Sequence, residues 1–232
     1  MDLDYGPEYD VFRKQVRAFI EAHRHLAPPS ADRAARPSSK AVEWQKLLIE
    51  HGYTARTIPQ EYGGYGAEPD ILQSRIIAEE FARARVPGGL SNQGISMFVP
   101  TLLELGTEEQ KRRWIEPTLK GKVVWCQGYS EPGAGSDLAN LKTRARVEKG
   151  EFVINGQKIW TSTAKQADMI FCLVMTEPEA PKHGGISYLI FSMDTPGIEV
   201  RPLKTMTGHA EFNETFFTEV RVPVDQIVGQ RG

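Results

Sequence analysis

The sequence predicts an α+β fold in two domains: an all-α helical domain over residues 1–121, then a small antiparallel β-barrel or sandwich over residues 122–232. Two observations support this prediction. Up to Gly121, apolar residues recur every three to four positions, as they do on one face of a helix. After Gly121, short runs of alternating apolar and polar residues follow one another between turn dipeptides, which is typical of antiparallel strands. A series of helices followed by a series of strands indicates an α+β protein.

Five helices are predicted in the first half, over residues 7–24, 39–51, 68–86, 90–105 and 107–121. In the first of them, Val16, Phe19 and Ile20 share one face. Pro100 should begin or kink the fourth helix, because proline lacks the N–H that a helix interior needs. Thr107 and Gln110 have the spacing of a capping box, so the fifth helix should open there.

About seven strands are predicted in the second half, beginning with the apolar run 123–126. The dipeptides Lys149-Gly150 and Asn155-Gly156 are hairpin signals, and they should divide residues 141–160 into successive antiparallel strands. The run 169–175 is apolar throughout, so it should be buried on both faces. Residues 186–192, 198–202 and 214–222 follow at hairpin-like spacing.

The composition excludes several classes of function. With 40% hydrophobic and 25% charged residues, the chain has the composition of an ordinary globular protein. Its net charge of −2 provides no positive electrostatic potential to attract nucleic acid. No apolar run approaches the ~20 residues of a membrane span. Cys126 and Cys172 lie in apolar runs, which favours two buried thiols over a disulfide. We therefore expect a soluble, cytoplasmic protein without nucleic-acid partners.

A glycine-containing loop follows the first strand. Glycine permits positive φ and lets a ligand approach the backbone, so Gly133 and Gly135 make the loop a candidate binding site. Hydroxyls and free amides in such a turn bind anionic or carbonyl groups. On spacing alone a plain turn is the alternative, and the loop matches neither the dinucleotide nor the phosphate-loop pattern. We interpret Glu131 and Asp137 as carboxylates that shape the loop through backbone hydrogen bonds, not as bases.

Two segments of the chain carry a resemblance to a known family. Residues 129–137, with the sequence Tyr-Ser-Glu-Pro-Gly-Ala-Gly-Ser-Asp, resemble the signature of the acyl-CoA dehydrogenase family. Residues 156–162, Gly-Gln-Lys-Ile-Trp-Thr-Ser, resemble that family's second flavin segment. The loop 57–66 and the stretch 212–223 also resemble family segments. The resemblance covers the family's N-terminal helical and middle β domains, and by this resemblance the chain looks truncated before the family's C-terminal helical domain.

The resemblance implies an FAD-dependent enzyme of lipid catabolism that dehydrogenates an acyl-CoA thioester at its α,β bond, with hydride transfer to flavin N5. It also implies electron-transfer flavoprotein as electron acceptor and a homo-oligomer, dimer or tetramer, in the full-length form. The family's catalytic base lies in the third domain, so we expect no catalytic residue before Gly232 and an inactive chain by itself. The alternatives are a non-catalytic flavin- or acyl-CoA-binding subunit completed by a partner chain, and an acyl-CoA oxidase.

The resemblance also assigns site residues. Ser130 would face the pyrimidine edge of the flavin, Trp160 would stack beside the ring, and Ser162 would lie close to N5. For Trp160, a core tryptophan is the alternative. The full cofactor set is Gln127, Tyr129, Ser130, Gly135, Ser136, Trp160, Thr161 and Ser162, and the substrate set is Ser136, Met97 and Leu103. The loop 130–136 and the strand end 160–162 should converge on one cleft between the helical and β parts. Five scattered histidines without ligand spacing give no metal site.

Overall fold

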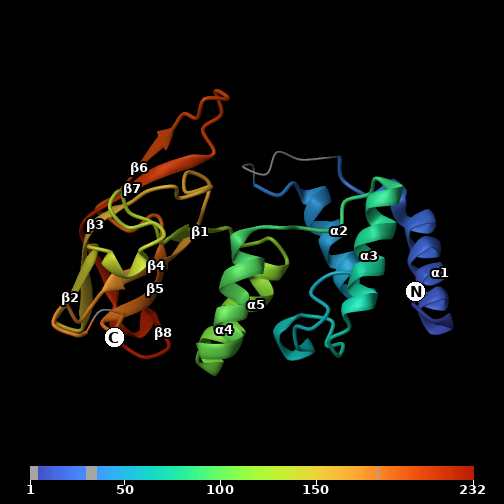
Figure 1. Ribbon diagram of the computed structural model, residues 1–232, viewed down its shortest axis with the longest axis horizontal. Helices are drawn as coiled ribbons and strands as arrows, with labels where there is room; N and C mark the ends of the chain where they lie inside the picture. Colours follow the sequence, from blue (N-terminus) through green and yellow to red (C-terminus); the bar gives the residue numbers. More distant parts are fainter. Residues whose placement is uncertain (1–4, 30–35, 182) are drawn as a thin grey trace. The chain divides into compact units, whose positions relative to one another are not determined.

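The computed structural model describes residues 5–29, 36–181 and 183–232 (Figure 1). The chain forms two compact units, one of residues 1–32, 37–91 and 115–122, and the other of residues 33–36, 92–114 and 123–232. The helical stretch 92–114 therefore groups with the strands, and the division passes through the fifth helix. The domain boundary at residue 121 stays a prediction.

The first unit is built on three helices: α1 (Pro7–His23), α2 (Ser39–Glu50) and α3 (Ile71–Ala84), with short 3₁₀ turns at η1 (Arg24–Leu26) and η2 (Gln60–Tyr62). Its core gathers around Phe19, whose ring centroid lies 4.5 Å from that of Tyr53 and 6.0 Å from that of Trp44. The face of α1 predicted to be apolar is buried at Val16, Phe19 and Ile20. Burial of this stripe gives the helices most of their stability, because isolated helices of this length are marginal in water.

The helices of the next segment are a π-helical turn η3 (Gly94–Phe98), α4 (Val99–Leu105) and α5 (Glu108–Leu119). Pro100 is the second residue of α4, which directly follows the π-helical turn, and the closing hydrogen bond of that turn runs from the amide of Val99 to the carbonyl of Gly94. The capping box at the start of α5 is confirmed: the amide of Gln110 donates to Thr107 Oγ1 at 3.2 Å, and the amide of Thr107 donates to Gln110 Oε1 at 3.1 Å. All five predicted helices are thus confirmed, the fourth starting at a π-helical turn.

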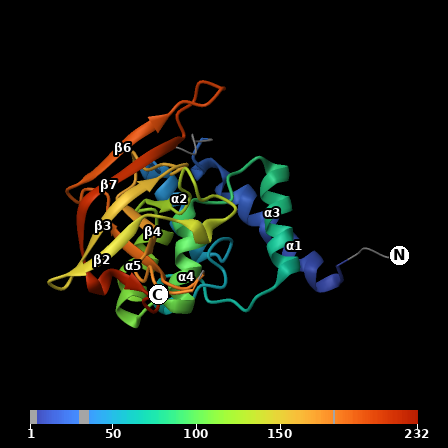
Figure 2. The same cartoon turned by 60° about the vertical axis from the view of Figure 1, so that its left-hand side comes forward.

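Within the described residues, one sheet contains all eight strands. They are β1 (Trp125–Gly128), β2 (Arg144–Glu148), β3 (Glu151–Lys158), β4 (Met169–Met175), β5 (Ile186–Ser192), β6 (Ile198–Leu203), β7 (Phe212–Pro223) and β8 (Ile227–Val228). Their order is β6-β7-β3-β2-β4-β5-β8, with β1 paired to β4. Strands β6 and β7 run side by side as a long hairpin (Figure 2). The α+β fold class is confirmed.

The sheet is open and mixed. It ends at β6 and β8 without closing into a barrel, and β4 runs parallel to both β1 and β2, while the other pairs are antiparallel. Strands β1 and β4 can pair in parallel because a long segment connects them. This segment contains the glycine-containing loop after β1 and the β2–β3 hairpin. Parallel neighbours need such a long connection. The predicted antiparallel arrangement was wrong at these two pairs, and the predicted alternative of a barrel is not formed.

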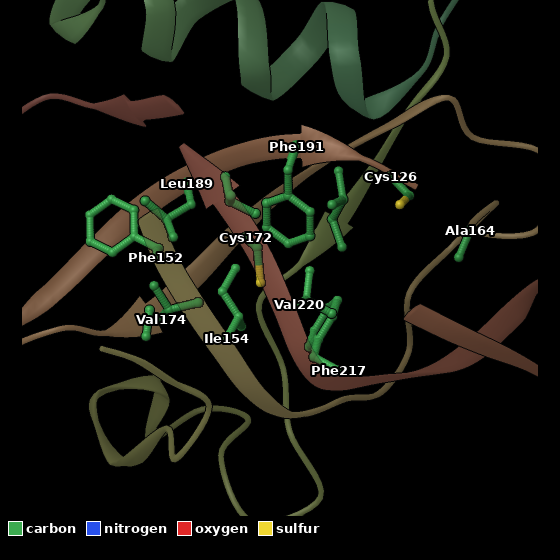
Figure 3. Packing of buried hydrophobic residues seen from close by; sticks show 13 residues of the cluster. Cys126, Phe152, Ile154, Ala164, Cys172, Val174, Leu189, Phe191, Phe217 and Val220 are labelled. Atoms are coloured by element: carbon green, nitrogen blue, oxygen red, sulfur yellow. The ribbon is translucent and has the colours of Figure 1, made fainter. Parts of the chain in front are cut away.

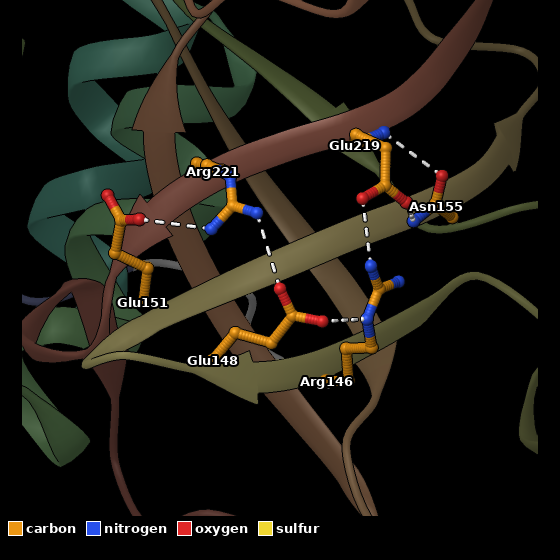
Figure 4. A network of polar contacts seen from close by, with 6 residues as sticks. All are labelled: Arg146, Glu148, Glu151, Asn155, Glu219 and Arg221. Atoms are coloured by element: carbon orange, nitrogen blue, oxygen red, sulfur yellow. Dashed lines mark hydrogen bonds and ion pairs between the residues drawn. The ribbon is translucent and has the colours of Figure 1, made fainter.

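The dipeptide Asn155-Gly156 continues within β3, opposite a β-bulge at Thr218 and Glu219 of β7, so its prediction as a hairpin was wrong. The register against β7 shifts between Ile154 and Gly156. Asn155 holds the bulge with its side chain: its Oδ1 accepts from the amide of Glu219 at 3.0 Å, and its Nδ2 donates to Glu219 Oε1 at 2.6 Å (Figure 4). The predicted turn at Lys149-Gly150 is confirmed, since both residues have positive φ and join β2 to β3.

Charged residues cover the outer face of β2, β3 and β7 (Figure 4). Arg146 lies between Glu148 at 2.6 Å and Glu219 at 2.8 Å, and Arg221 contacts Glu148 at 3.2 Å and Glu151 at 3.3 Å. Arg146, Glu219 and Arg221 are exposed and Glu148 and Glu151 are half-buried, so each pair contributes little to stability by itself. These charged groups occupy one face of the sheet, and the hydrophobic core packs against the opposite face.

The core of the second unit lies on that opposite face and contains buried residues from β1, β2, β3, β4, β5 and β7 (Figure 3). Its members include Phe152, Ile154, Leu189, Phe191, Phe217 and Val220. Cys126 and Cys172 are buried free thiols, as predicted. Burial raises the pKa of both thiols, that of Cys172 to about 11, so neither ionises near neutral pH. No helix in the described part of the chain has the length and apolarity needed to cross a membrane.

Gly156→Ala should destabilise the protein by about 1–3 kcal/mol, the range for forced overpacking. The added Cβ would lie 2.7 Å from the backbone Cα of Thr143, at a φ of +154°. Gly150→Ala is the matched control, because its φ is +83° but a Cβ there meets nothing within 4 Å. Urea unfolding should show the larger loss for Gly156→Ala. Equal losses would mean that backbone conformation, not crowding, limits both sites.

Candidate functional site

The site begins at β1, whose first residue is anchored in an aromatic cluster. Trp125 is 1% exposed, with its ring centroid 3.7 Å from that of Phe98 and 5.4 Å from that of Trp114. Phe98 closes the π-helical turn η3, a type of turn frequent at functional sites. This packing fixes where the loop after β1 starts.

A buried ion pair sets the shape of the loop. Lys158, fully buried at the end of β3, donates from Nζ to Glu131 Oε1 at 2.8 Å and to the carbonyl of Tyr129 at 3.1 Å. Glu131 also accepts from the amides of Lys142 at 2.6 Å and Thr143 at 2.9 Å. The prediction that Glu131 shapes the loop through backbone hydrogen bonds is confirmed.

The same contacts determine the ionisation of Glu131. Burial by itself would raise the pKa of its carboxyl, but the hydrogen bond and charge of Lys158 act against this, together with the amides of Thr143 and Lys142. The resulting pKa lies below the ordinary value for a glutamate. Glu131 is therefore a carboxylate with its oxygens already engaged, and it is poorly suited to take a proton from a substrate.

The two motif segments lie side by side. The amide of Ile159 donates to the carbonyl of Ser130 at 2.9 Å, so the loop is bonded to the residue directly before Trp160. Together with the contact from Lys158 to Tyr129, this brings Ser130 and the strand end 160–162 to one edge of the sheet. The convergence expected from the sequence is confirmed within the second unit. Its placement in a cleft between the helical and β parts stays a prediction.

The glycines of the loop leave its surface uncovered, and they do not adopt positive φ. Neither Gly133 nor Gly135 has positive φ, which corrects the first of the two roles expected for them. A Cβ at either position would meet nothing within 4 Å. The tight turn is made instead by Glu131 and Ala134, each of whose amides donates to the other's carbonyl, at 2.8 and 3.1 Å. The loop surface at Gly133, Gly135 and the exposed Ser136 is therefore open.

Trp160 is not a core tryptophan. Its side chain is 56% exposed, and its ring meets that of Phe212 edge to face, with centroids 5.7 Å apart. Its φ is +59°, and that of Thr163 is +61°. A bulky or β-branched residue rarely adopts this left-handed conformation, which is strained and tends to occur at functional sites. The chain thus presents a large planar apolar ring beside the open loop.

The other residues assigned from the resemblance differ in exposure. Gln127 and Ser162 are half-buried, and Gln127 Oε1 accepts from Gln93 Nε2 at 3.3 Å. The ring of Tyr129 packs edge-on against Phe171, with centroids 5.8 Å apart. Thr161 is fully buried. Their contacts with a cofactor stay predictions.

Met97 and Leu103, the proposed substrate residues, lie on η3 and α4 in the same unit as the loop. Both are half-buried, and the carbonyl of Met97 accepts from Thr101 Oγ1 at 2.9 Å. Phe98, next to Met97, carries the contact to Trp125 at the start of β1. Their role toward an acyl chain stays a prediction.

Sequence reasoning did not single out Lys158 or Asn213. Lys158 could have been found from the alternation along β3, because it lies on the same buried face as Phe152 and Ile154. A charged residue on a buried face requires a partner. Asn213 left none, because its buried contacts are made with a turn some fifty residues away along the chain. Among residues 5–29, 36–181 and 183–232, no three acidic, histidine or cysteine side chains are grouped to hold a metal ion.

Lys158→Met and Glu131→Gln should each destabilise the flavin-free protein by about 3–5 kcal/mol, because each leaves a buried polar partner uncompensated. The double variant should lose less than the sum of the two single losses, as expected for residues in contact. Urea unfolding of the four proteins measures this coupling. If the loss in the double variant equals the sum of the two single losses, the 2.8 Å contact between Lys158 and Glu131 has no coupling energy.

The pKa of Glu131 also predicts the direction of a pH effect. Because its pKa is lower in the folded than in the unfolded protein, its contribution is present above the unfolded pKa and is lost as pH falls through the folded value. The wild-type protein should therefore lose stability in acid more steeply than Glu131→Gln. Parallel stability curves between pH 7 and pH 3 would contradict this.

Comparison with known proteins gives two family matches and a set of close relatives. Residues 6–122 match the model of the acyl-CoA dehydrogenase N-terminal domain, and residues 126–220 match that of the acyl-CoA dehydrogenase middle domain. Acyl-CoA dehydrogenase IpdE1 of Mycobacterium tuberculosis is 38% identical over 233 residues, which cover 97% of this chain and 60% of IpdE1. The chain therefore spans less than two thirds of this relative's length.

Solved structures show the same similarity. The Tcur3481-Tcur3483 steroid ACAD superposes with a TM-score of 0.77 and 36% identity, covering 100% of this chain and 59% of that one. The ChsE4-ChsE5 complex from Mycobacterium tuberculosis superposes with a TM-score of 0.78 and 35% identity, covering 100% and 58%. Both similarities extend over the helical and the β parts of this chain.

Proposed function

This chain belongs to the acyl-CoA dehydrogenase family, and from that premise we propose that it supplies the helical and flavin-binding β parts of an FAD-dependent acyl-CoA dehydrogenase. Members of the family are FAD-dependent flavoproteins. The observation that carries the proposal is the meeting of both motif segments at one sheet edge, where a strained, half-exposed Trp160 lies beside an open loop. Because the chain spans 60% of IpdE1, the activity of the whole protein is part of the proposal.

The residues at this edge fit a flavin. Trp160 offers an exposed planar face, and Ser130 and Ser162 are half-buried hydroxyls able to donate hydrogen bonds to the polar rim of a ring. The loop at Gly133 and Gly135 leaves room for a phosphate or ribityl group to approach the backbone. When bound, FAD serves as the two-electron acceptor of the dehydrogenation.

We further propose that acyl-CoA reaches the flavin past Ser136, with Met97 and Leu103 beside its acyl chain. Ser136 is exposed at the end of the loop, and the other two are half-buried apolar residues on the adjoining helical turns. The base that takes the α-proton is proposed to lie outside both motif segments, because the oxygens of Glu131 are occupied by Lys158 and two amides. Electron-transfer flavoprotein is the proposed acceptor, and a cytoplasmic location stays a prediction.

A second candidate is a subunit that works only with a different partner chain. It is supported by the similarity to the ChsE4-ChsE5 complex, which contains two named chains. The two candidates differ in what the purified whole protein does alone. A self-sufficient enzyme retains FAD and turns over without a partner, whereas a subunit gains one or both properties on co-expression with it.

The decisive experiment is the visible spectrum of the purified whole protein, titrated with fatty, amino-acid-derived and sterol-derived acyl-CoA thioesters. Flavin absorbance that bleaches on substrate addition is the expected result. Admission of air after anaerobic bleaching then separates a dehydrogenase from an oxidase, since only an oxidase reoxidises rapidly. A protein that neither carries nor takes up FAD, alone or with its partner, would disprove the proposal.

Trp160→Ala should weaken FAD retention while lowering the stability of the flavin-free protein by much less than the ~3–5 kcal/mol of a buried tryptophan. The reason is its 56% exposure. Trp125→Ala is the control, because Trp125 is 1% exposed and should show the full loss. Thermal unfolding and flavin titration measure the two effects. A stability loss at Trp160 equal to that at Trp125 would support a core role instead.

A further inference from the structure

Resting on the proposed function, we propose that Asn213 is a positioning residue for the flavin-facing turn 160–163. Its side chain does not contact the cofactor in this proposal. It holds the backbone of the turn so that Trp160 and Ser162 face the ligand together. Nothing in the two sequence motifs includes this residue, which lies at the start of β7.

The turn needs such support because it is strained at both ends. Trp160 and Thr163 have φ values of +59° and +61°, and neither residue is glycine. A left-handed conformation at such residues is unfavourable and persists only where the surroundings enforce it. Without external contacts the segment would relax toward ordinary φ values, and the ring of Trp160 would turn away from its present direction.

Three consecutive peptide groups of the turn are bonded to the start of β7. The amide of Thr161 donates to the carbonyl of Asn213 at 3.0 Å, and the amide of Thr163 donates to the carbonyl of Glu211 at 3.2 Å. Between them, the carbonyl of Thr161 accepts from Nδ2 of Asn213 at 2.8 Å. The peptide group between Thr161 and Ser162 is thus held by a side chain, while the groups on either side of it are held by backbone.

Asn213 lies where it can position the turn but cannot reach a ligand on the surface. It is 2% exposed, and its partner Thr161 is fully buried. The neighbouring Phe212 contacts the ring of Trp160 edge to face, at 5.7 Å between centroids. Residues 211–213 therefore hold both the backbone of the turn and its aromatic side chain.

The choice of asparagine is not explained by packing stability. Its Oδ1 has no hydrogen-bond partner in the described part of the chain, and neither does Oγ1 of Thr161. A buried polar atom without a partner is destabilising, so an apolar side chain would serve a purely structural position better. The bond from Nδ2 to Thr161 is what the asparagine adds, and it acts on the turn that carries Trp160 and Ser162.

Asn213→Ala and Asn213→Asp in the whole holoenzyme test the proposal. Both remove the donor, and the aspartate also places an acceptor against the Thr161 carbonyl. We expect FAD affinity to fall up to about tenfold for alanine, the effect of one hydrogen bond, and further for aspartate. The visible circular dichroism of the bound flavin should change, because the ring of Trp160 is reoriented. Both readouts are taken at a temperature where far-ultraviolet circular dichroism shows each variant folded.

Thr215→Val is the matched control. Thr215 is fully buried two residues further along β7, and its Oγ1 has no hydrogen-bond partner among the described residues. This nearly isosteric change disturbs the same strand without touching the turn. We expect its FAD affinity to stay within about twofold of wild type and its flavin spectrum to be unchanged.

A measurement on the flavin-free protein separates this inference from the proposed function. Hydrogen exchange at the amides of Thr161 and Thr163 should accelerate in Asn213→Ala but not in Thr215→Val. If the wild-type protein binds FAD and Asn213→Ala matches it in affinity and flavin spectrum, the positioning role is overturned and the proposed function stands. If the wild-type protein never binds FAD, faster exchange in Asn213→Ala would show that Asn213 holds the turn but that no flavin is bound there. That result would overturn both the positioning role and the proposed function.

Discussion

The ion pair between Lys158 and Glu131 is the interaction on which the site depends. It joins the end of β3 to the loop after β1, and through Glu131 it reaches the amides of Lys142 and Thr143 just before β2. Three separate chain segments are therefore held by one buried carboxylate. A buried charge pair does little for net stability, but a charge left alone there is strongly unfavourable, so the loop has few alternatives to this arrangement.

Rigid support and local strain are combined around that pair. The π-helical turn, the aromatic contact of Phe98 with Trp125 and the hydrophobic core hold the sheet edge in place. Against this background, residues 160–163 adopt a turn that no isolated peptide would favour. The hydrogen bonds from the start of β7 retain it. An exposed ring and an open loop result, which is the arrangement that a planar ligand requires.

Local signals in the sequence predicted most of the fold. Helix periodicity predicted the five helices, the spacing of Thr107 and Gln110 predicted a cap, and the apolar run at Met169–Met175 predicted β4 with its bounds. Prediction failed where a partner far along the chain decided the outcome. Asn155-Gly156 has the composition of a hairpin turn, yet the dipeptide continues β3, and Asn155 contacts Glu219 in the bulge of the neighbouring β7. The direction of β1 against β4 likewise depends on the path of the chain between them.

By itself, the sequence determined the fold class, the helices and most of the strands, the family resemblance and the loop-shaping role of Glu131, because these follow from periodicity, short-range chemistry and motif order. Only the tertiary structure decided which groups meet. In the folded protein, Lys158 binds Glu131 of the loop, and Trp160 is exposed at positive φ. The side chain of Asn213 donates a hydrogen bond to the carbonyl of Thr161. The physical reason is that pairing across a sheet and burial of a charge depend on strand register, and register is a property of the assembled sheet.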